Sequence, residues 1–234
     1  MNGENLLMQD ADIVFSYAID AATYKEIQHL RDLGHKIILI SEYMEQFPID
    51  KAKWIFPMSL AYEKENLAEG FMDSITDNYL SLKNLVRNVD IRPSVFMGFP
   101  WKGTWYMSGG KSFQANFFKD AAGNYKWSDS KKESGMPLNM EQVFAKALDA
   151  EIWINPGSKT SLSDILKSDE RFEDFFAFEN KSVFNNDFRT NTTGGNDYWE
   201  SGVVRPDLIL ADLIKIFHPE IPLKHDFVYY RRLK

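Results

Sequence analysis

The chain has 234 residues, of which 44% are hydrophobic and 26% are charged, and its formal net charge is −7. This length allows one large domain or two small ones, and the composition supports an ordinary packed core. The acidic balance argues against binding to a nucleic-acid backbone, which needs a basic surface. The absence of cysteine excludes disulfides, thiolate metal ligands and cysteine nucleophiles. No stretch reaches the roughly 18 to 20 apolar residues of a membrane-spanning helix.

The first part of the chain has the pattern of a strand, a helix and a second strand. Residues 12–17 and 36–40 are short runs rich in aliphatic residues, which is typical of buried strands. Residues 21–33 between them show helical spacing of apolar side chains, and Gly34 ends that helix. A strand, a helix and a strand with short connections predict a βαβ unit with parallel strands.

The next segment predicts one long helix. Residues 57–88 contain no proline after Pro57, and apolar residues recur along them. At 1.5 Å per residue such a helix would be roughly 45 Å long, more than a small domain needs, and a helix of this length often bridges two bodies. We therefore expect a partial first lobe over 1–57, a bridging helix over 58–88 and a second lobe over 89–234.

The rest of the chain repeats the α/β alternation. The expected strands are 93–99, 151–154 and 182–184, and the expected helices are 112–122, 141–147, 161–167 and 206–217. Ser161 is a good N-cap, and Pro206 stands in the first turn of its helix, where proline is tolerated. The fold class predicted is α/β, with a parallel sheet in each lobe.

Aromatic residues follow the strand that ends near Phe99. In open α/β sheets, ligands bind beyond the carboxyl ends of the strands, so Trp101, Trp105 and Tyr106 are candidates for stacking on a planar chelate or macrocycle. The alternative is that some of them fill the core. Lys102 either pairs with an anionic ligand or is simply solvated.

Further candidates come from the polar loop near residue 190 and from the first lobe. Arg189 suits a carboxylate or phosphate on a ligand, and pairing with Asp187 or Asp197 is the alternative. Tyr198 is a candidate for shaping the same cleft. In the first lobe, Tyr17 ends one strand and Tyr43 follows the other, so both side chains are expected at one rim.

No catalytic or metal motif stands out. The sequence has no nucleophile elbow and no phosphate-cradling loop with a terminal lysine, and the four histidines lack ligand-like spacing. The chain is therefore not expected to be an enzyme or to hold a metal through its own side chains. The alternative is a glycan-binding or glycan-hydrolysing exported protein, because aromatic rings stack on sugars and Asp197 and Glu200 are possible acids.

Several segments resemble the solute-binding proteins of iron-complex and cobalamin importers, especially their Bacteroidetes branch. The resemblance covers essentially the whole chain and is carried by residues 98–106 with Gly109 and Gly110, 154–157, 195–202, 205–207, 218–220 and 229–230. The segment 196–201 and the C-terminal tail are its most specific parts.

The resemblance implies two Rossmann-like lobes joined by one long helix, with the ligand in the cleft between them. It implies a periplasmic, lipid-anchored component of an ABC importer that binds a ferric siderophore, haem or cobalamin and has no cofactor of its own. Each lobe of the family offers a Glu to the permease dimer, and by position these are Glu4 and Glu141. Without the family, both are ordinary helix-start carboxylates.

The start of the chain departs from the family pattern. Relatives begin with a signal sequence and the first strands of the first lobe, whereas this chain begins at the helix of Glu4 and carries no signal pattern. We therefore expect an incomplete first lobe. Missing strands would expose edges and apolar surface, so dimerisation through that lobe or weak ligand binding is expected.

Overall fold

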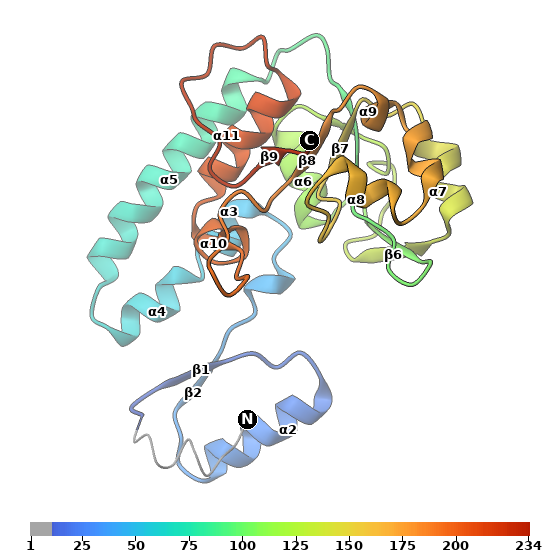
Figure 1. The fold of residues 1–234 in the computed structure, drawn as a ribbon. Helices are drawn as coiled ribbons and strands as arrows, with labels where there is room; N and C mark the ends of the chain where they lie inside the picture. Colours follow the sequence, from blue (N-terminus) through green and yellow to red (C-terminus); the bar gives the residue numbers. More distant parts are fainter. Residues whose placement is uncertain (1–10) are drawn as a thin grey trace.

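The computed structural model describes residues 11–234, and its first part is the predicted βαβ unit (Figure 1). It consists of β1 (Val14–Ser16), α2 (Ala21–Asp32) and β2 (Ile37–Leu39). The strands are parallel, with Val14 opposite Ile37. The Asp20 side chain caps α2 by accepting a hydrogen bond from the Thr23 amide. The buried core cluster of this βαβ unit is small and consists, within the described residues, of Ile27, Leu30 and Ile37.

A short linker leads to three helices. Residues Glu42–Met44 form a 3₁₀ turn, and α3 (Pro48–Ala52), α4 (Ile55–Ala61) and α5 (Glu65–Leu85) follow. The prediction of a single helix over 58–88 is wrong, because the chain turns between α4 and α5. Glu63 has a positive φ of 53° there, and the Lys64 amide bonds back to the Ser59 carbonyl. The division of the chain at residues 57 and 89 stays a prediction.

The larger part of the chain is built on a five-stranded sheet with the order β5-β3-β7-β8-β9. The strands are β3 (Ser94–Met97), β5 (Asn124–Tyr125), β7 (Ile152–Ile154), β8 (Val183–Asn185) and β9 (Arg231–Arg232). Neighbouring strands are parallel except for β9, which runs antiparallel to β8. The expected strands near 93–99, 151–154 and 182–184 are confirmed, and the fold class is α/β.

Helices and turns surround this sheet. The helices are α6 (Phe113–Asp120), α7 (Met140–Ala147), α8 (Leu162–Leu166), α9 (Phe176–Glu179), α10 (Ser201–Val204) and α11 (Pro206–Phe217), with 3₁₀ turns at Glu170–Asp174 and Asp197–Trp199. The four expected helices are confirmed within a few residues. Ser161 caps α8 as predicted, with its side chain accepting from the Asp164 amide.

A small antiparallel sheet not foreseen from the sequence joins β4 (Trp105–Ser108) to β6 (Gly135–Leu138). The core of the larger part is rich in aromatic rings. The Phe96 ring centre lies 4.8 Å from that of Phe175 and 5.0 Å from that of Trp153. Much of the aromatic content therefore fills a core. Within the described residues, none of the helices has the length and apolar character needed to cross a membrane.

Candidate ligand-binding edge of the parallel sheet

The carboxyl ends of β3, β7 and β8 lie at the same edge of the sheet because these strands are parallel. The chain leaves this edge in three segments, residues 98–104, 155–161 and 186–196, which we call the strand-end loops. In Figure 1 this edge faces the β1–α2–β2 unit. The described fold thus has the polar and aromatic loops on the side where open α/β sheets bind ligands.

A hollow of about 430 Å³ lies between the first two of these loops and residues 168–172, and Phe99, Lys159, Arg171 and Phe172 are among the residues that line it. The Lys159 Nζ lies 4.7 Å from the centre of the Phe99 ring and donates to Ser168 Oγ at 2.6 Å. Such a pair suits an anionic ligand with flat apolar parts, because the ammonium can contact its anionic groups and the ring can stack on its flat parts.

Arg171 is the second cation of this hollow. Its guanidinium donates to both oxygens of Asp169, with the shortest distance 2.6 Å, and lies 5.7 Å from the Phe144 ring centre. The hydrogen bonds from Arg171 lower the pKa of Asp169 below its usual value, so that carboxylate stays charged near neutral pH. Sequence reasoning missed Lys159, Arg171 and Phe99, although Lys159 closely follows the Asn155-Pro156-Gly157 strand stop.

Trp101 and Lys102 lie at the tip of the first strand-end loop. The Trp101 and Thr104 amides and carbonyls bond to each other at 2.8 and 3.0 Å, which closes a tight turn. Lys102 and Gly103 both have positive φ in this turn. The Trp101 side chain is 62% exposed, and the Lys102 Nζ lies 4.6 Å from its ring centre. These two predicted residues form an exposed aromatic–cation pair at the edge.

Trp105 does not belong to the edge, and its prediction as a cleft residue is wrong. It is 0% exposed, and its Nε1 donates to the Met97 carbonyl at 2.9 Å. Side chains alternate along β4, so Trp105 points into the core while Tyr106 is 56% exposed. Gly98 makes room for the indole, because a Cβ at that position would lie 3.0 Å from Trp105 Nε1.

Arg189 takes the structural alternative that the sequence left open. Its Nε lies 3.1 Å from Asp197 Oδ2, while Asp187 pairs with Arg231 at 2.6 Å. More than half of the Arg189 side chain is exposed, so the ion pair holds the loop without covering the guanidinium. Arg189 therefore lies at the strand-end edge of the sheet with part of its guanidinium group exposed to solvent.

Tyr198 is also wrong as a cleft residue. Its side chain is 3% exposed, and its ring meets those of Tyr229 and Tyr230 edge to face at 6.0 and 5.8 Å. Burial raises the pKa of Tyr198 to about 12. The neighbouring Trp199 is 53% exposed instead, because consecutive residues of the 3₁₀ turn face different directions.

The first-lobe candidates Tyr17 and Tyr43 lie together at the carboxyl ends of β1 and β2. Their ring centres are 6.1 Å apart, and each side chain is close to half exposed. The Tyr43 hydroxyl donates to the Ala18 carbonyl at 3.3 Å. Partial burial, together with the nearby Glu42 carboxylate, raises the pKa of Tyr17. The expected shared rim is present in this unit.

The two proposed docking carboxylates differ in what the structure describes. Glu141 is exposed in the first turn of α7, which Asn139 and Gln142 cap reciprocally. An exposed carboxylate at a helix N-terminus fits a docking contact and an ordinary helix start equally well. Glu4 lies outside the described residues.

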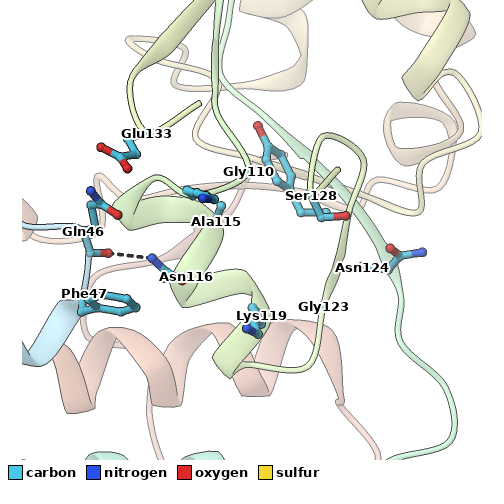
Figure 2. Close-up of a pocket in the computed structure, with 12 residues that line it drawn as sticks. Gln46, Phe47, Gly110, Ala115, Asn116, Lys119, Gly123, Asn124, Ser128 and Glu133 are labelled. Atoms are coloured by element: carbon cyan, nitrogen blue, oxygen red, sulfur yellow. Dashed lines mark hydrogen bonds between the residues drawn. The ribbon is translucent and has the colours of Figure 1, made fainter. Parts of the chain in front are cut away.

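A hollow of about 570 Å³ lies elsewhere, beside α6 (Figure 2). The Asn116 Nδ2 donates to the Gln46 carbonyl at 2.9 Å across one end of this hollow, which fastens the linker after β2 to α6. None of the site residues predicted within 11–234 lines it. Within residues 11–234, no group of three or more His, Asp or Glu side chains is placed to hold a metal ion.

Several solved structures that share this fold are described as periplasmic binding proteins. A possible iron-binding periplasmic solute-binding protein from Staphylococcus epidermidis matches 93% of this chain and 80% of its own, with a TM-score of 0.70 and 17% identity. The periplasmic heme-binding protein RhuT from Roseiflexus matches 94% and 80%, with a TM-score of 0.71 and 16% identity. The chain has the fold of the periplasmic solute-binding proteins.

A further solved structure has the same fold, and one relative is similar in sequence. A TroA-like periplasmic binding protein, FepB from Veillonella parvula, covers 100% of the chain and 76% of its own length, with a TM-score of 0.67 and 16% identity. In sequence, an uncharacterized lipoprotein of Methanocaldococcus jannaschii is 27% identical over 201 residues. The chain spans only 45% of the length of that relative. No family model matches the chain.

Proposed function

We propose that the chain is the solute-binding component of an ABC importer and that it binds an iron complex or cobalamin between two Rossmann-like lobes. The periplasmic-binding fold supports this, since the solved proteins that share it are described as solute-binding proteins, two of them for iron or heme. The observation that carries the proposal is the pairing of cations with aromatic faces at the strand-end loops. Trp101 with Lys102 and Phe99 with Lys159 provide two such pairs.

These pairs define the chemistry of the ligand. Haem is flat and aromatic, ferric catecholate siderophores present aromatic rings, and both carry anionic oxygens, so a ring face and an ammonium placed together can meet both parts. Arg171 and the exposed part of Arg189 add guanidinium donors, which bind carboxylates in a bidentate manner. Tyr17 and Tyr43 would supply aromatic area from the first lobe.

The glycan-hydrolase alternative has no observation in its favour. Asp197 is paired with Arg189, and its other oxygen accepts from the Ser201 amide at 3.4 Å, so this carboxylate serves the loop. The proteins that share the fold are binding proteins.

Docking on the permease belongs to the same proposal. Glu141 is exposed on α7, and Glu4 is its proposed counterpart in the first lobe. Charge reversal at Glu141 is expected to abolish transport in cells while changing ligand affinity far less, because Glu141 itself does not line the hollow and reaches it only through its electrostatic effect on Arg171. Lipid anchoring in the periplasm is part of this proposal and fits the lipoprotein relative.

The decisive experiment is a titration of the protein with a ferric catecholate siderophore, haem and cobalamin. Binding would be followed by calorimetry and by quenching of tryptophan fluorescence. The double variant Trp101→Ala/Lys159→Gln is expected to weaken binding of the preferred ligand by at least about tenfold, because two contact residues are lost. The matched control is Tyr62→Ala/Lys131→Gln, which removes an aromatic ring and a cation from exposed positions outside the hollow.

Equal affinity in the double variant and the control would move the site away from the strand-end loops. Absence of binding to all three ligand classes by the native protein would refute the proposed ligand chemistry.

A further inference from the structure

A basic hollow lies at the opposite edge of the five-stranded sheet from the strand-end loops. It has a volume of about 360 Å³ and is formed where α5 ends, where the chain enters β3, and where α6 ends before β5. The end of α5 and the segment after it are at the top of Figure 1, on the side away from the β1–α2–β2 unit. The hollow is therefore separate from the proposed ligand edge.

Four cationic side chains line this hollow: Lys83, Arg87, Arg92 and Lys119. Among the described residues, Asp120 is the only acidic one in its lining, and it bonds to Lys83 at 2.7 Å and to the Tyr79 hydroxyl at 2.8 Å. The charge of Asp120 is thus already balanced by Lys83. In the part of the chain that the structure describes, no ion pair joins Arg87, Arg92 or Lys119 to a carboxylate.

The hollow is locally positive although the chain has a net charge of −7. The C-terminal ends of α5 and α6 attract cations, and this accounts for Lys83 and Lys119, which stand in or near those last turns. It does not account for Arg92, which lies in the segment before β3 and donates to the Arg87 carbonyl at 3.3 Å. Helix ends alone therefore do not explain why three segments bring cations together.

The floor and the mouth of the hollow have different characters. Val86 and Ala122 line it and are 1% and 2% exposed, so its floor is part of the packed core. The four cationic residues are exposed, so their donors reach solvent. Guanidinium groups bind phosphate oxygens in a bidentate manner, and lysine adds a mobile point charge. A small tetrahedral anion could therefore rest on the packed floor of the hollow and accept hydrogen bonds from the cationic side chains at its mouth.

We propose that this hollow binds a phosphate group, either free phosphate or the headgroup of an anionic phospholipid. Lys119 and Lys111 also line the neighbouring hollow shown in Figure 2, but the acidic Glu133 lines it as well, so the proposed site is confined to the hollow at the end of α5. In this arrangement Arg87 and Arg92 hold the phosphate oxygens, and Lys119 adds a further positive charge at the mouth. This site is independent of the importer function proposed above.

The test uses the whole chain and two probes. Inorganic phosphate is titrated while the backbone amide signals of residues 86–92 and 119–122 are followed by NMR. Co-sedimentation is measured with vesicles of phosphatidylglycerol and, as the uncharged comparison, of phosphatidylcholine. The variant Arg87→Gln/Arg92→Gln is expected to weaken binding roughly threefold to thirtyfold, because two exposed charge contacts are lost.

The matched control is Lys131→Gln/Lys224→Gln, which makes the same change in net charge at exposed positions outside the hollow. Arg87→Gln alone keeps the hydrogen bond of Arg92 to the carbonyl of residue 87 and serves as the variant least able to disturb folding. Saturable phosphate shifts that the control retains and both Arg87 variants weaken support the site and identify free phosphate as a ligand. Binding to phosphatidylglycerol vesicles alone, with the same variant dependence, supports the headgroup.

Two results overturn the proposal. One is binding to neither probe by the native chain. The other is equal weakening by the control and the Arg87 variants, which would show an effect of net charge alone.

Discussion

The β1–α2–β2 unit and the body built on the five-stranded sheet differ most in the size of their cores. Within the described residues, the core cluster of the first unit has three buried hydrophobic side chains, whereas the body has a continuous aromatic core around Phe96 and Trp153. Because the hydrophobic effect grows with buried apolar area, most of the stability belongs to the body. The two candidate rims are therefore supported unequally: Tyr17 and Tyr43 stand on the weaker unit, and Trp101 and Lys159 on the stronger one.

The largest effect is expected in the core of the body. Trp153 is 0% exposed and donates to the Gly98 carbonyl at 2.8 Å, so Trp153→Ala removes both buried area and a hydrogen bond. We expect a loss of about 4 kcal/mol in the free energy of unfolding, measured by urea denaturation. The control Trp101→Ala, at an exposed ring, is expected to cost less than about 0.5 kcal/mol. Similar losses in both variants would contradict the location of the core.

A slightly smaller effect is expected at Asp212, the buried carboxylate that holds the C-terminal tail. It accepts hydrogen bonds from the Tyr229 and Tyr230 amides at 2.7 and 3.0 Å and also bonds to His225. Asp212→Ala leaves these buried donors without a partner and should cost about 3 kcal/mol. Asp212→Asn keeps an acceptor and should cost less. If the asparagine variant is the less stable of the two in thermal denaturation, this account fails.

The first unit provides the direct test of unequal support. Ile27→Ala removes one of its three buried side chains and is expected to lower the local opening free energy by about 2 kcal/mol. Hydrogen exchange should accelerate in residues 14–39 and stay unchanged in β3, β7 and β8, since local units open independently of the global transition. Equal acceleration in both regions would show that the two parts unfold together.

The smallest effect at neutral pH is expected for Tyr198→Phe, at about 1 kcal/mol, because one buried hydroxyl contact is lost. The free energy of unfolding at alkaline pH should change more than that at neutral pH. The folded pKa of Tyr198 is about 12 against an ordinary value of 10.0, so its contribution is present below pH 10 and is lost as the pH rises toward 12. The stability of Tyr198→Phe should therefore fall less steeply over this window in urea titrations. An unchanged slope would place Tyr198 in contact with water.

The sequence alone predicted most regular elements of the fold. The runs at 151–154 and 206–217 became β7 and α11 because apolar spacing and the nearby prolines are local signals. The sequence did not predict the turn between α4 and α5, because a glutamate such as Glu63 is not a residue type from which a positive φ is expected. It also missed β9, which is only two residues long and pairs with β8 across a long separation in the sequence.

The strand-end loops that the proposal assigns to the site were expected from the sequence, but the side chains that face solvent there were only partly those expected. Strand ends in a parallel sheet share one edge, so the sequence could locate Trp101, Lys102 and the loop of Arg189. Whether an aromatic side chain faces that edge or the core depends on its neighbours in space. Trp105 is buried by the alternation of β4 and by the room at Gly98, and Tyr198 is buried by the tyrosines of the tail.

The amino-acid sequence by itself thus determined the alternation of strands and helices, the parallel sheets and the sheet edge where a ligand is expected. These features follow from local periodicity and strand direction. Only the tertiary structure decided which cations rest on which rings, which aromatic residues fill the core, and where positive charge gathers at the end of α5. Those features arise from contacts between residues far apart in the sequence, and no local pattern encodes them.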